Sequence, residues 1–285
     1  MKKMKAYGEL MKLRLNVLVV LTVWWGYASV VPAHASPLRL FHLLLGSTLV
    51  ACAGAAFNQW MERDLDALMR RTQHRPLPEG RLTPAEALGF ASTLTVIGAL
   101  ELFIFVNGLT CALSLLTLAI YVCVYTPLKR KSSLSTLVGA IPGAIPPLMG
   151  WAGATGRLDP QAWVLFAILF LWQLPHFLAI AWMYREDYAR AGFPMLPVID
   201  PDGGMTSRMI LLYTAVLIPV TLLPAHYGYA GVSYVCGALM LGAAFFACGA
   251  VTAFYRTAAS ARRLLLVSVI YLPSLLTWMA FSRPA

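Results

Sequence analysis

Charge is scarce in this sequence. Asp, Glu, Lys and Arg make up 12% of its 285 residues, whereas hydrophobic residues make up 59%. A soluble domain carries about 25% charged residues. This shortage, together with apolar runs of near-spanning length along the whole chain, excludes a soluble fold and predicts an all-α polytopic membrane protein. The polar stretches between the runs are short, so we expect residues 1–285 to form a single transmembrane domain.

The cysteines lack the spacing of a metal or redox motif. None belongs to a CxxC pair, and all lie in apolar runs. Isolated cysteines in apolar surroundings usually act as small packing residues. The sequence therefore predicts neither a disulfide framework nor a cysteine-ligated metal. The five are Cys52, Cys111, Cys123, Cys236 and Cys248.

Nine apolar runs have lengths close to what a bilayer requires. We place them at residues 15–31, 38–59, 84–106, 109–126, 136–153, 161–183, 208–224, 229–251 and 264–281. An odd number of spans puts the termini on opposite sides. Of 22 Lys and Arg residues, only Arg39, Arg157 and Arg283 fall on the side opposite the N-terminus. By the positive-inside rule, the N-terminus is expected in the cytoplasm and the C-terminus on the other side.

The same asymmetry accounts for most of the net charge of +10. The basic residues therefore indicate the lipid bilayer as a partner and do not indicate nucleic acid. Two connections on the cytoplasmic side, at about 62–83 and 184–207, are long and charged, whereas the outer connections are short. We expect the active-site loops in these two segments.

A polar column is predicted at the end of the second span. Asn58, Glu62 and Asp66 are spaced i, i+4 and i+8, so a helix presents one amide and two carboxylates on one face. Carboxylates near hydrocarbon are costly unless they are paired or metal-bound. Oxygen ligands of this kind suit Mg²⁺, and the arginines that follow can hold phosphate oxygens. The alternative is an ion-paired, solvated helix end.

A second polar cluster ends the sixth span. On a continuous helix His176, Met183 and Asp187 would share a face, and Glu186 adds a further carboxylate. The basic triplet at 129–131 lies on the same side of the membrane. Acids and bases that converge at one leaflet, at the mouth of an apolar cavity, predict a site for a prenyl diphosphate.

His176 lies inside a span, where ionisable residues are candidates for function. It could ligate haem iron or contact an acceptor. It could equally form a hydrogen bond with a neighbouring helix, and the sequence leaves both interpretations open.

Three segments carry a resemblance that covers nearly the whole chain: "NQWMERDLDALMRRTQHRPLP", "YTPLKRKSSLSTLVGAIPGAIPPLMGWAGATG" and "WQLPHFLAIAWMYREDYARAGFPMLP". They resemble the haem-modifying branch of the UbiA superfamily of intramembrane prenyltransferases. The resemblance implies nine helices around a central cavity in the bacterial cytoplasmic (inner) membrane. It also implies transfer of the farnesyl group of farnesyl diphosphate to a vinyl group of haem B, with addition of water, giving haem O and diphosphate. Haem B would be substrate and Mg²⁺ the cofactor.

The same resemblance assigns roles to residues. The first superfamily motif maps onto Asn58, Glu62 and Asp66, with Glu62 in place of the usual aspartate. The second motif has Tyr184 and Tyr188 where the superfamily has aspartates, which leaves the ligands of a second metal ion open. Expected metal ligands are Asn58, Glu62, Asp66, Glu186 and Asp187, and the expected catalytic set is Asn58, Glu62, Asp66, Tyr184 and Asp187.

Substrate contacts are predicted on the same basis. Expected diphosphate-binding residues are Arg63, Arg70, Arg71, Arg75, Lys129, Arg130 and Arg185. Expected haem-binding or acceptor-binding residues are His176, Trp172, Gln173 and Phe177. Phe177, Trp172 and Tyr184 are candidates to shelter the allylic cation. Haem A synthase or a haem-copper oxidase assembly is a candidate partner. The alternatives are another aromatic or tetrapyrrole acceptor, or a transporter of an anionic solute.

Overall fold

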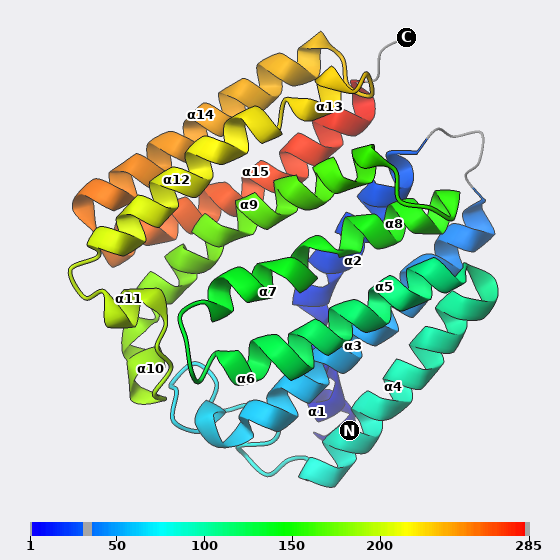
Figure 1. The fold of residues 1–285 in the computed structure, drawn as a ribbon. Coiled ribbons are helices and arrows are strands. Elements are labelled where there is room, and N and C mark those ends of the chain that lie inside the picture. The colour runs from blue at the N-terminus through cyan, green and yellow to red at the C-terminus, as the bar shows by residue number, and fades with distance from the viewer. Residues whose placement is uncertain (1, 31–35, 283–285) are drawn as a thin grey trace.

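The computed structural model describes residues 2–30 and 36–282, and every regular element in these ranges is helical. Figure 1 shows the arrangement. The first half contains α1 (Lys2–Leu10), α2 (Leu13–Ala28), α3 (Pro37–Asp66), α4 (Pro84–Phe105), α5 (Gly108–Ala119), the π-helical η2 (Ile120–Tyr125), α6 (Thr126–Leu128), α7 (Ser135–Ala144) and α8 (Pro146–Thr155). The second half contains α9 (Pro160–Met183), α10 (Arg185–Arg190), α11 (Leu196–Ile199), α12 (Gly204–Val220), α13 (Leu223–His226), α14 (Val232–Tyr255) and α15 (Ala258–Phe281).

These elements confirm the prediction of nine membrane helices. Eight helical stretches are long and apolar enough to cross a bilayer, and α2 is a shorter apolar helix of 16 residues. Three stretches combine successive elements: α5 with η2 and α6, α7 with α8, and α12 with α13. The helix predicted over 15–31 ends at Ala28, and residue 31 lies outside the described residues, as does Arg283.

The helices surround an interior between two groups. In Figure 1, α9, α12, α14 and α15 pack side by side, α3, α4 and α5 form the other group, and α7 and α8 run between them. Helix α2 crosses α8 so closely that a Cβ on Gly26 would overlap the backbone of Pro147. Small residues such as glycine allow two helix backbones to approach this closely. The resulting packing favours helix association, which the hydrophobic effect does not drive inside a bilayer.

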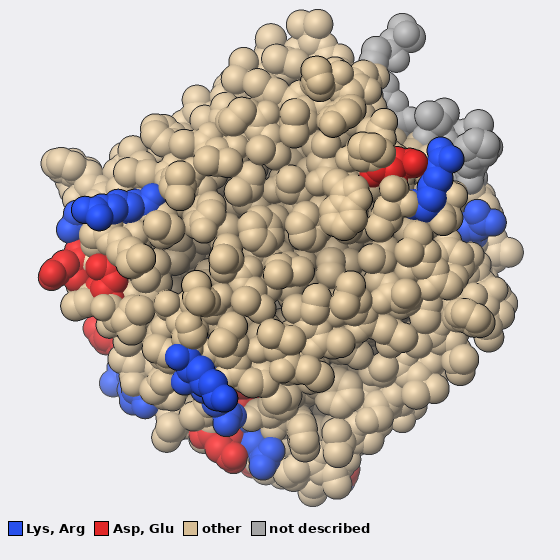
Figure 2. All heavy atoms as spheres, viewed as in Figure 1, with Lys and Arg blue, Asp and Glu red and all other residues tan. Residues whose placement is uncertain are grey.

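The surface fits a bilayer. Figure 2 shows charged side chains at the two ends of the bundle on this face, with a broad uncharged band between them. The band is the hydrocarbon-facing belt of an integral membrane protein. Helix α1 and the end of α15 lie at opposite ends of the bundle (Figure 1), as an odd number of spans requires.

Two predicted boundaries change in the structure. The second span was expected over 38–59, but α3 continues to Asp66, so the whole polar column is helical. The sixth span ends at Met183, and Tyr184 has φ −111° and ψ 22° before α10 begins. The prediction that His176 and Asp187 share one face of a continuous helix is therefore wrong, because the chain turns at Tyr184.

Candidate active site

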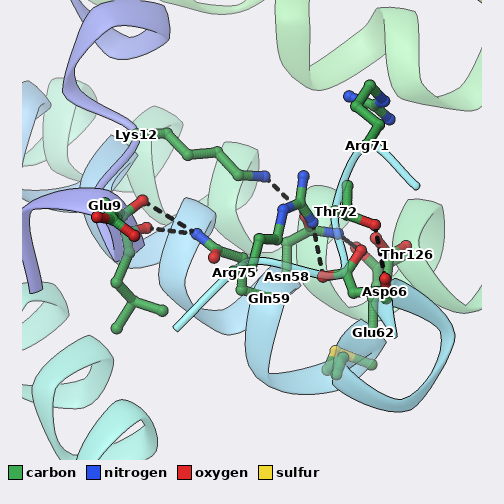
Figure 3. Close-up of polar contacts among 12 residues, drawn as sticks. Glu9, Lys12, Asn58, Gln59, Glu62, Asp66, Arg71, Thr72, Arg75 and Thr126 are labelled. Atoms are coloured by element: carbon green, nitrogen blue, oxygen red, sulfur yellow. Dashed lines mark hydrogen bonds and ion pairs between the residues drawn. The ribbon is translucent and has the colours of Figure 1, made fainter. Parts of the chain in front are cut away.

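The last turns of α3 carry the polar column in a buried position. Asn58, Glu62 and Asp66 are 3%, 2% and 0% exposed, and Figure 3 shows them as successive side chains along the helix. The i, i+4 spacing explains this alignment. A buried column of two carboxylates and one amide requires compensation from elsewhere in the fold.

Each member of the column has its own cation. Lys129 Nζ lies 2.7 Å from Glu62 Oε1, and Arg75 Nη1 lies 2.6 Å from Asp66 Oδ2. Lys12 Nζ donates to Asn58 Oδ1 at 3.2 Å. Figure 3 shows Lys12 and Arg75 reaching the column from different parts of the chain. Three segments far apart in sequence thus supply positive charge to one helix end.

Lys12 is a site residue that sequence reasoning did not find. It separates α1 from α2 in a left-handed backbone conformation, with φ 49°. Gln59 Nε2 donates to Leu10 O at 2.8 Å, which fixes this turn against α3. Burial, reinforced by the nearby Arg75 guanidinium, lowers the pKa of Lys12 to about 7. In the sequence, Lys12 is one of several basic residues next to the first span. The positive-inside rule already explains basic residues at this position, so Lys12 did not stand out as a site residue.

Lys129 behaves differently. Burial is the largest single influence and disfavours its ammonium, but the charge and hydrogen bond of Glu62, together with Tyr188 and Tyr121, outweigh burial, so the pKa of Lys129 is raised above its ordinary value. Its Nζ also lies 5.4 Å from the Tyr125 ring centre and 5.1 Å from that of Phe193. Lys129 is therefore a charged residue enclosed by a carboxylate and two aromatic faces.

The column fits a hard divalent cation. Asp66 Oδ1 is buried and has no hydrogen-bond partner among the described residues. Thr126 Oγ1 accepts a hydrogen bond from Asn58 Nδ2 at 3.3 Å, which leaves Asn58 Oδ1 facing Lys12. Carboxylate and amide oxygens are the ligands that Mg²⁺ prefers. Within residues 2–30 and 36–282, no group of three or more His, Cys, Asp or Glu side chains is placed to hold a metal, so this set depends on Asn58.

The second acidic segment meets the loop that follows α3. The backbone N–H of Arg71 donates to Asp187 Oδ2 at 3.3 Å, and its side chain donates to Tyr188 OH at 3.5 Å. The Arg71 guanidinium also lies 5.1 Å from the Tyr184 ring centre. The two predicted active-site loops therefore lie together, and Arg71 connects them through these contacts.

Other predicted residues point elsewhere. Glu186 and Arg70 are exposed and form no hydrogen bond or ion pair within the described ranges. Three predicted diphosphate contacts have other partners: Arg63 donates to Trp60 O at 2.9 Å, Arg130 donates to Met61 O at 2.7 Å, and Arg185 lies 5.0 Å from the Trp182 ring centre.

Of the predicted acceptor residues, Phe177 alone in the described structure lines the apolar cavity that lies next to Lys12. His176 Nδ1 lies 2.7 Å from Ser268 Oγ on α15, and its ring stacks on Trp172 at 5.0 Å. Gln173 Nε2 donates to Ala140 O at 2.8 Å. The interhelical hydrogen bond left open by the sequence is thus present, and a haem contact by His176 stays a prediction.

An apolar cavity of about 330 Å³ begins at Lys12 and extends away from the column between α2, α3, α5, η2, α7 and α8. The π-helical turns of η2 present Tyr121 and Tyr125 to it, with ring centres 5.3 Å apart. π-helical turns inside longer helices often occur at functional sites. A second pocket of about 330 Å³ shares Lys12 and Leu15 with the cavity and is also lined by Arg71 and Arg75. A polar vestibule and an apolar chamber therefore meet at Lys12.

The family model of the UbiA prenyltransferase family matches residues 19–276. The chain belongs to the UbiA prenyltransferase family. A protein of Solibacter usitatus (strain Ellin6076), named Protoheme IX farnesyltransferase, is 48% identical over 99% of both chains. A protein of the same name from Koribacter versatilis (strain Ellin345) is 43% identical, over 98% of this chain and 94% of its own.

Solved structures of family members have the same fold. A digeranylgeranylglyceryl phosphate synthase matches with a TM-score of 0.80 and 16% identity, over 99% of both chains. A UbiA homologue from Archaeoglobus fulgidus, bound to DMAPP and Mg²⁺, matches with a TM-score of 0.70 and 14% identity, over 96% of this chain and 99% of that one. At these identities the similarity shows the shared fold of UbiA proteins.

Proposed function

We propose that the protein transfers the farnesyl group of farnesyl diphosphate to a vinyl group of haem B (protohaem IX), with addition of water, giving haem O and diphosphate. The observation that supports this most is the junction at Lys12 between a buried, cation-rich polar column and an apolar cavity. A ligand with an anionic head and a hydrocarbon tail fits both parts at once. The acceptor is proposed from the relatives named Protoheme IX farnesyltransferase.

The column would hold the cofactor. Asn58, Glu62 and Asp66 offer oxygen atoms to Mg²⁺, and Asp66 Oδ1 has no hydrogen-bond partner in the part of the chain that the structure describes. When bound, Mg²⁺ neutralises charge on a diphosphate leaving group. The predicted ligands Glu186 and Asp187 would have to approach from α10, where Asp187 now accepts hydrogen bonds from Arg71 and Arg190.

The three cations would exchange partners when substrate binds. Lys12, Arg75 and Lys129 now neutralise the column, and each ends in a flexible side chain. Once the column carries a divalent ion, these cations can turn to the diphosphate oxygens and stabilise the charge that develops there. Arg71 would join them from the vestibule. The other predicted arginines would contact the diphosphate only after leaving their present partners.

Chemistry would occur where the vestibule meets the cavity. The bond between farnesyl C1 and the diphosphate oxygen breaks, and its electron pair leaves with diphosphate. The faces of Tyr121, Tyr125 and Phe177 line the apolar side and can stabilise the allylic cation. The haem vinyl group attacks C1, water adds to the resulting haem-side cation, and one proton is released. Tyr184, held under Arg71, is proposed to face the acceptor from the loop side.

We further propose that residues 1–285 act as one domain in the bacterial cytoplasmic membrane, with the N-terminus and both active-site loops in the cytoplasm. The support is the concentration of Lys and Arg at the end of the bundle that carries the column. A haem A synthase or a haem-copper oxidase assembly would receive haem O.

The test is a reconstituted assay. Purified protein receives haem B, farnesyl diphosphate and Mg²⁺, and products are identified by mass. We expect haem O in the parent and its loss with a chelator. Glu62→Gln and Asp66→Asn should each reduce kcat/KM by about 10²–10³-fold, the range that removal of one preorganised electrostatic group costs.

Asp64→Asn is the matched control. Asp64 lies in the same helix end, but its side chain is 78% exposed and, among the described residues, its carboxylate forms an ion pair only with Arg63. Its activity should stay within twofold of the parent. Parent protein that forms no haem O, but prenylates another aromatic acceptor, would refute haem as the substrate. Normal output from Asp66→Asn would refute the assignment of the column.

A further inference from the structure

The far end of the apolar cavity contains two hydroxyl groups with unusual surroundings. Ser47 on α3 and Ser114 on α5 line the cavity and are 4% and 1% exposed. Neither Oγ atom has a hydrogen-bond partner among the described residues. A buried hydroxyl without a partner is costly, so such a pair points to something polar that binds there.

Hydroxyl groups close to the two serines bond to the helix backbone instead. Thr48, next to Ser47, donates to Leu44 O at 2.6 Å, and Thr117, one turn from Ser114, donates to Leu113 O at 2.8 Å. Such bonds to the preceding helical turn are the usual solution for serine and threonine in lipid. Ser47 and Ser114 lack this bond and face the chamber.

Both serines lie toward the end of the cavity that is far from Lys12. Helices α3 and α5 run parallel, and a Cβ on Gly54 would meet Leu118 Cδ1 at 3.3 Å. Ser47 lies about two turns before Gly54 on α3, and Ser114 lies about one turn before Leu118 on α5. Both serines therefore face the same end of the cavity.

The depth of the cavity matches a chain of three isoprene units. Its lining on the α2 side runs from Lys12 to Val23, eleven residues apart, which corresponds to about 16 Å of helix. An extended farnesyl chain spans about 15 Å, taking roughly 1.25 Å per main-chain bond. Beyond Ser47 the next turn of α3 is filled by packed side chains, because Leu43 is fully buried and a Cβ on Gly153 would lie 2.9 Å from its Cδ2.

We propose that Ser47 and Ser114 bind water at the far end of the cavity and thereby limit the prenyl donor to about fifteen carbons. This rests on the proposed prenyl transfer. A farnesyl chain leaves the hydrated end undisturbed. A chain one isoprene unit longer must displace this water, so that its hydrocarbon lies against the two serine hydroxyls. The hydroxyls then lose the hydrogen bonds that the water provided, which is energetically costly. Selectivity for chain length then comes from polarity as well as from volume.

The test is a competition between equal concentrations of farnesyl and geranylgeranyl diphosphate, with haem B and Mg²⁺. The ratio of C20 to C15 haem products gives the ratio of kcat/KM values. For the Ser47→Ala/Ser114→Ala variant we expect this ratio to rise about tenfold, equivalent to about 1.4 kcal/mol, with smaller rises in each single variant. The single variants also provide the test if the double variant is not recovered folded.

Thr117→Val is the matched control. It removes a hydroxyl that lines the same cavity but already has a partner, so its product ratio should equal that of the parent. A ratio in the double variant within twofold of the parent, or an equal shift in Thr117→Val, would overturn the proposal. Absence of product from any prenyl diphosphate in the parent would instead refute the proposed function itself.

Discussion

The buried ion pair between Glu62 and Lys129 permits a test that separates stability from catalysis. The two side chains are 2% and 12% exposed and their charged atoms lie 2.7 Å apart. At this distance Coulomb's law gives an attraction of about 6 kcal/mol for an effective dielectric constant of about 20. Most of it offsets desolvation, but removing one partner of a buried pair costs about 3–5 kcal/mol because the other charge is left uncompensated.

Three variants form the cycle: Glu62→Gln, Lys129→Met and the double variant. Each single variant should lower Tm by about 10 °C, taking a few degrees per kcal/mol for a chain of this size. The double variant should recover most of this loss, because no buried charge is left without a partner. All three should be inactive, since the proposed mechanism needs both charges.

Thermal unfolding in detergent, followed by tryptophan fluorescence at pH 7.5, measures stability, and haem O formation measures activity. The pH is suitable because the pKa of Lys129 is raised above its ordinary value. A raised lysine pKa means that the stability gained from the lysine charge is fully present at pH 7.5 and is lost only above about pH 10. A double variant as unstable as the single variants would refute the reasoning, as would one that keeps parental activity.

Three further predictions concern Lys12, Tyr125 and His176. Because burial lowers the pKa of Lys12 to about 7, its charged form declines from pH 6 to pH 8. The affinity for metal-free diphosphate should therefore fall over this interval, and calorimetry of Lys12→Met should show a weaker dependence on pH. Tyr125→Phe should keep kcat within threefold, whereas Tyr125→Leu should lower it about tenfold, because the ring face and not the hydroxyl stabilises the cation; equal losses in both would contradict this. His176→Ala should lose haem affinity in a spectral titration without loss of diphosphate affinity, and equal haem affinity in variant and parent would remove His176 from the site.

The comparison of Arg63 with Arg75 shows how far local spacing can predict a site. Arg63 directly follows Glu62, so on a helix it faces away from the column, and its guanidinium donates to the backbone at Trp60. Arg75 lies outside the helix, in a segment whose course spacing does not determine, yet it reaches Asp66 at 2.6 Å. Periodicity is reliable only while the helix continues.

The sequence by itself determined the nine membrane helices and the alignment of Asn58, Glu62 and Asp66. Both follow from local rules: apolar length for a bilayer, and the helical repeat for a column of side chains. Only the tertiary structure decided which cation meets each member of the column, because Lys12 and Lys129 approach from 46 and 67 residues away. The same holds for the far end of the cavity, where the packing of α3 on α5 places two hydroxyls from different helices in one lining. Such contacts depend on how helices pack in three dimensions, which no spacing along one chain segment specifies.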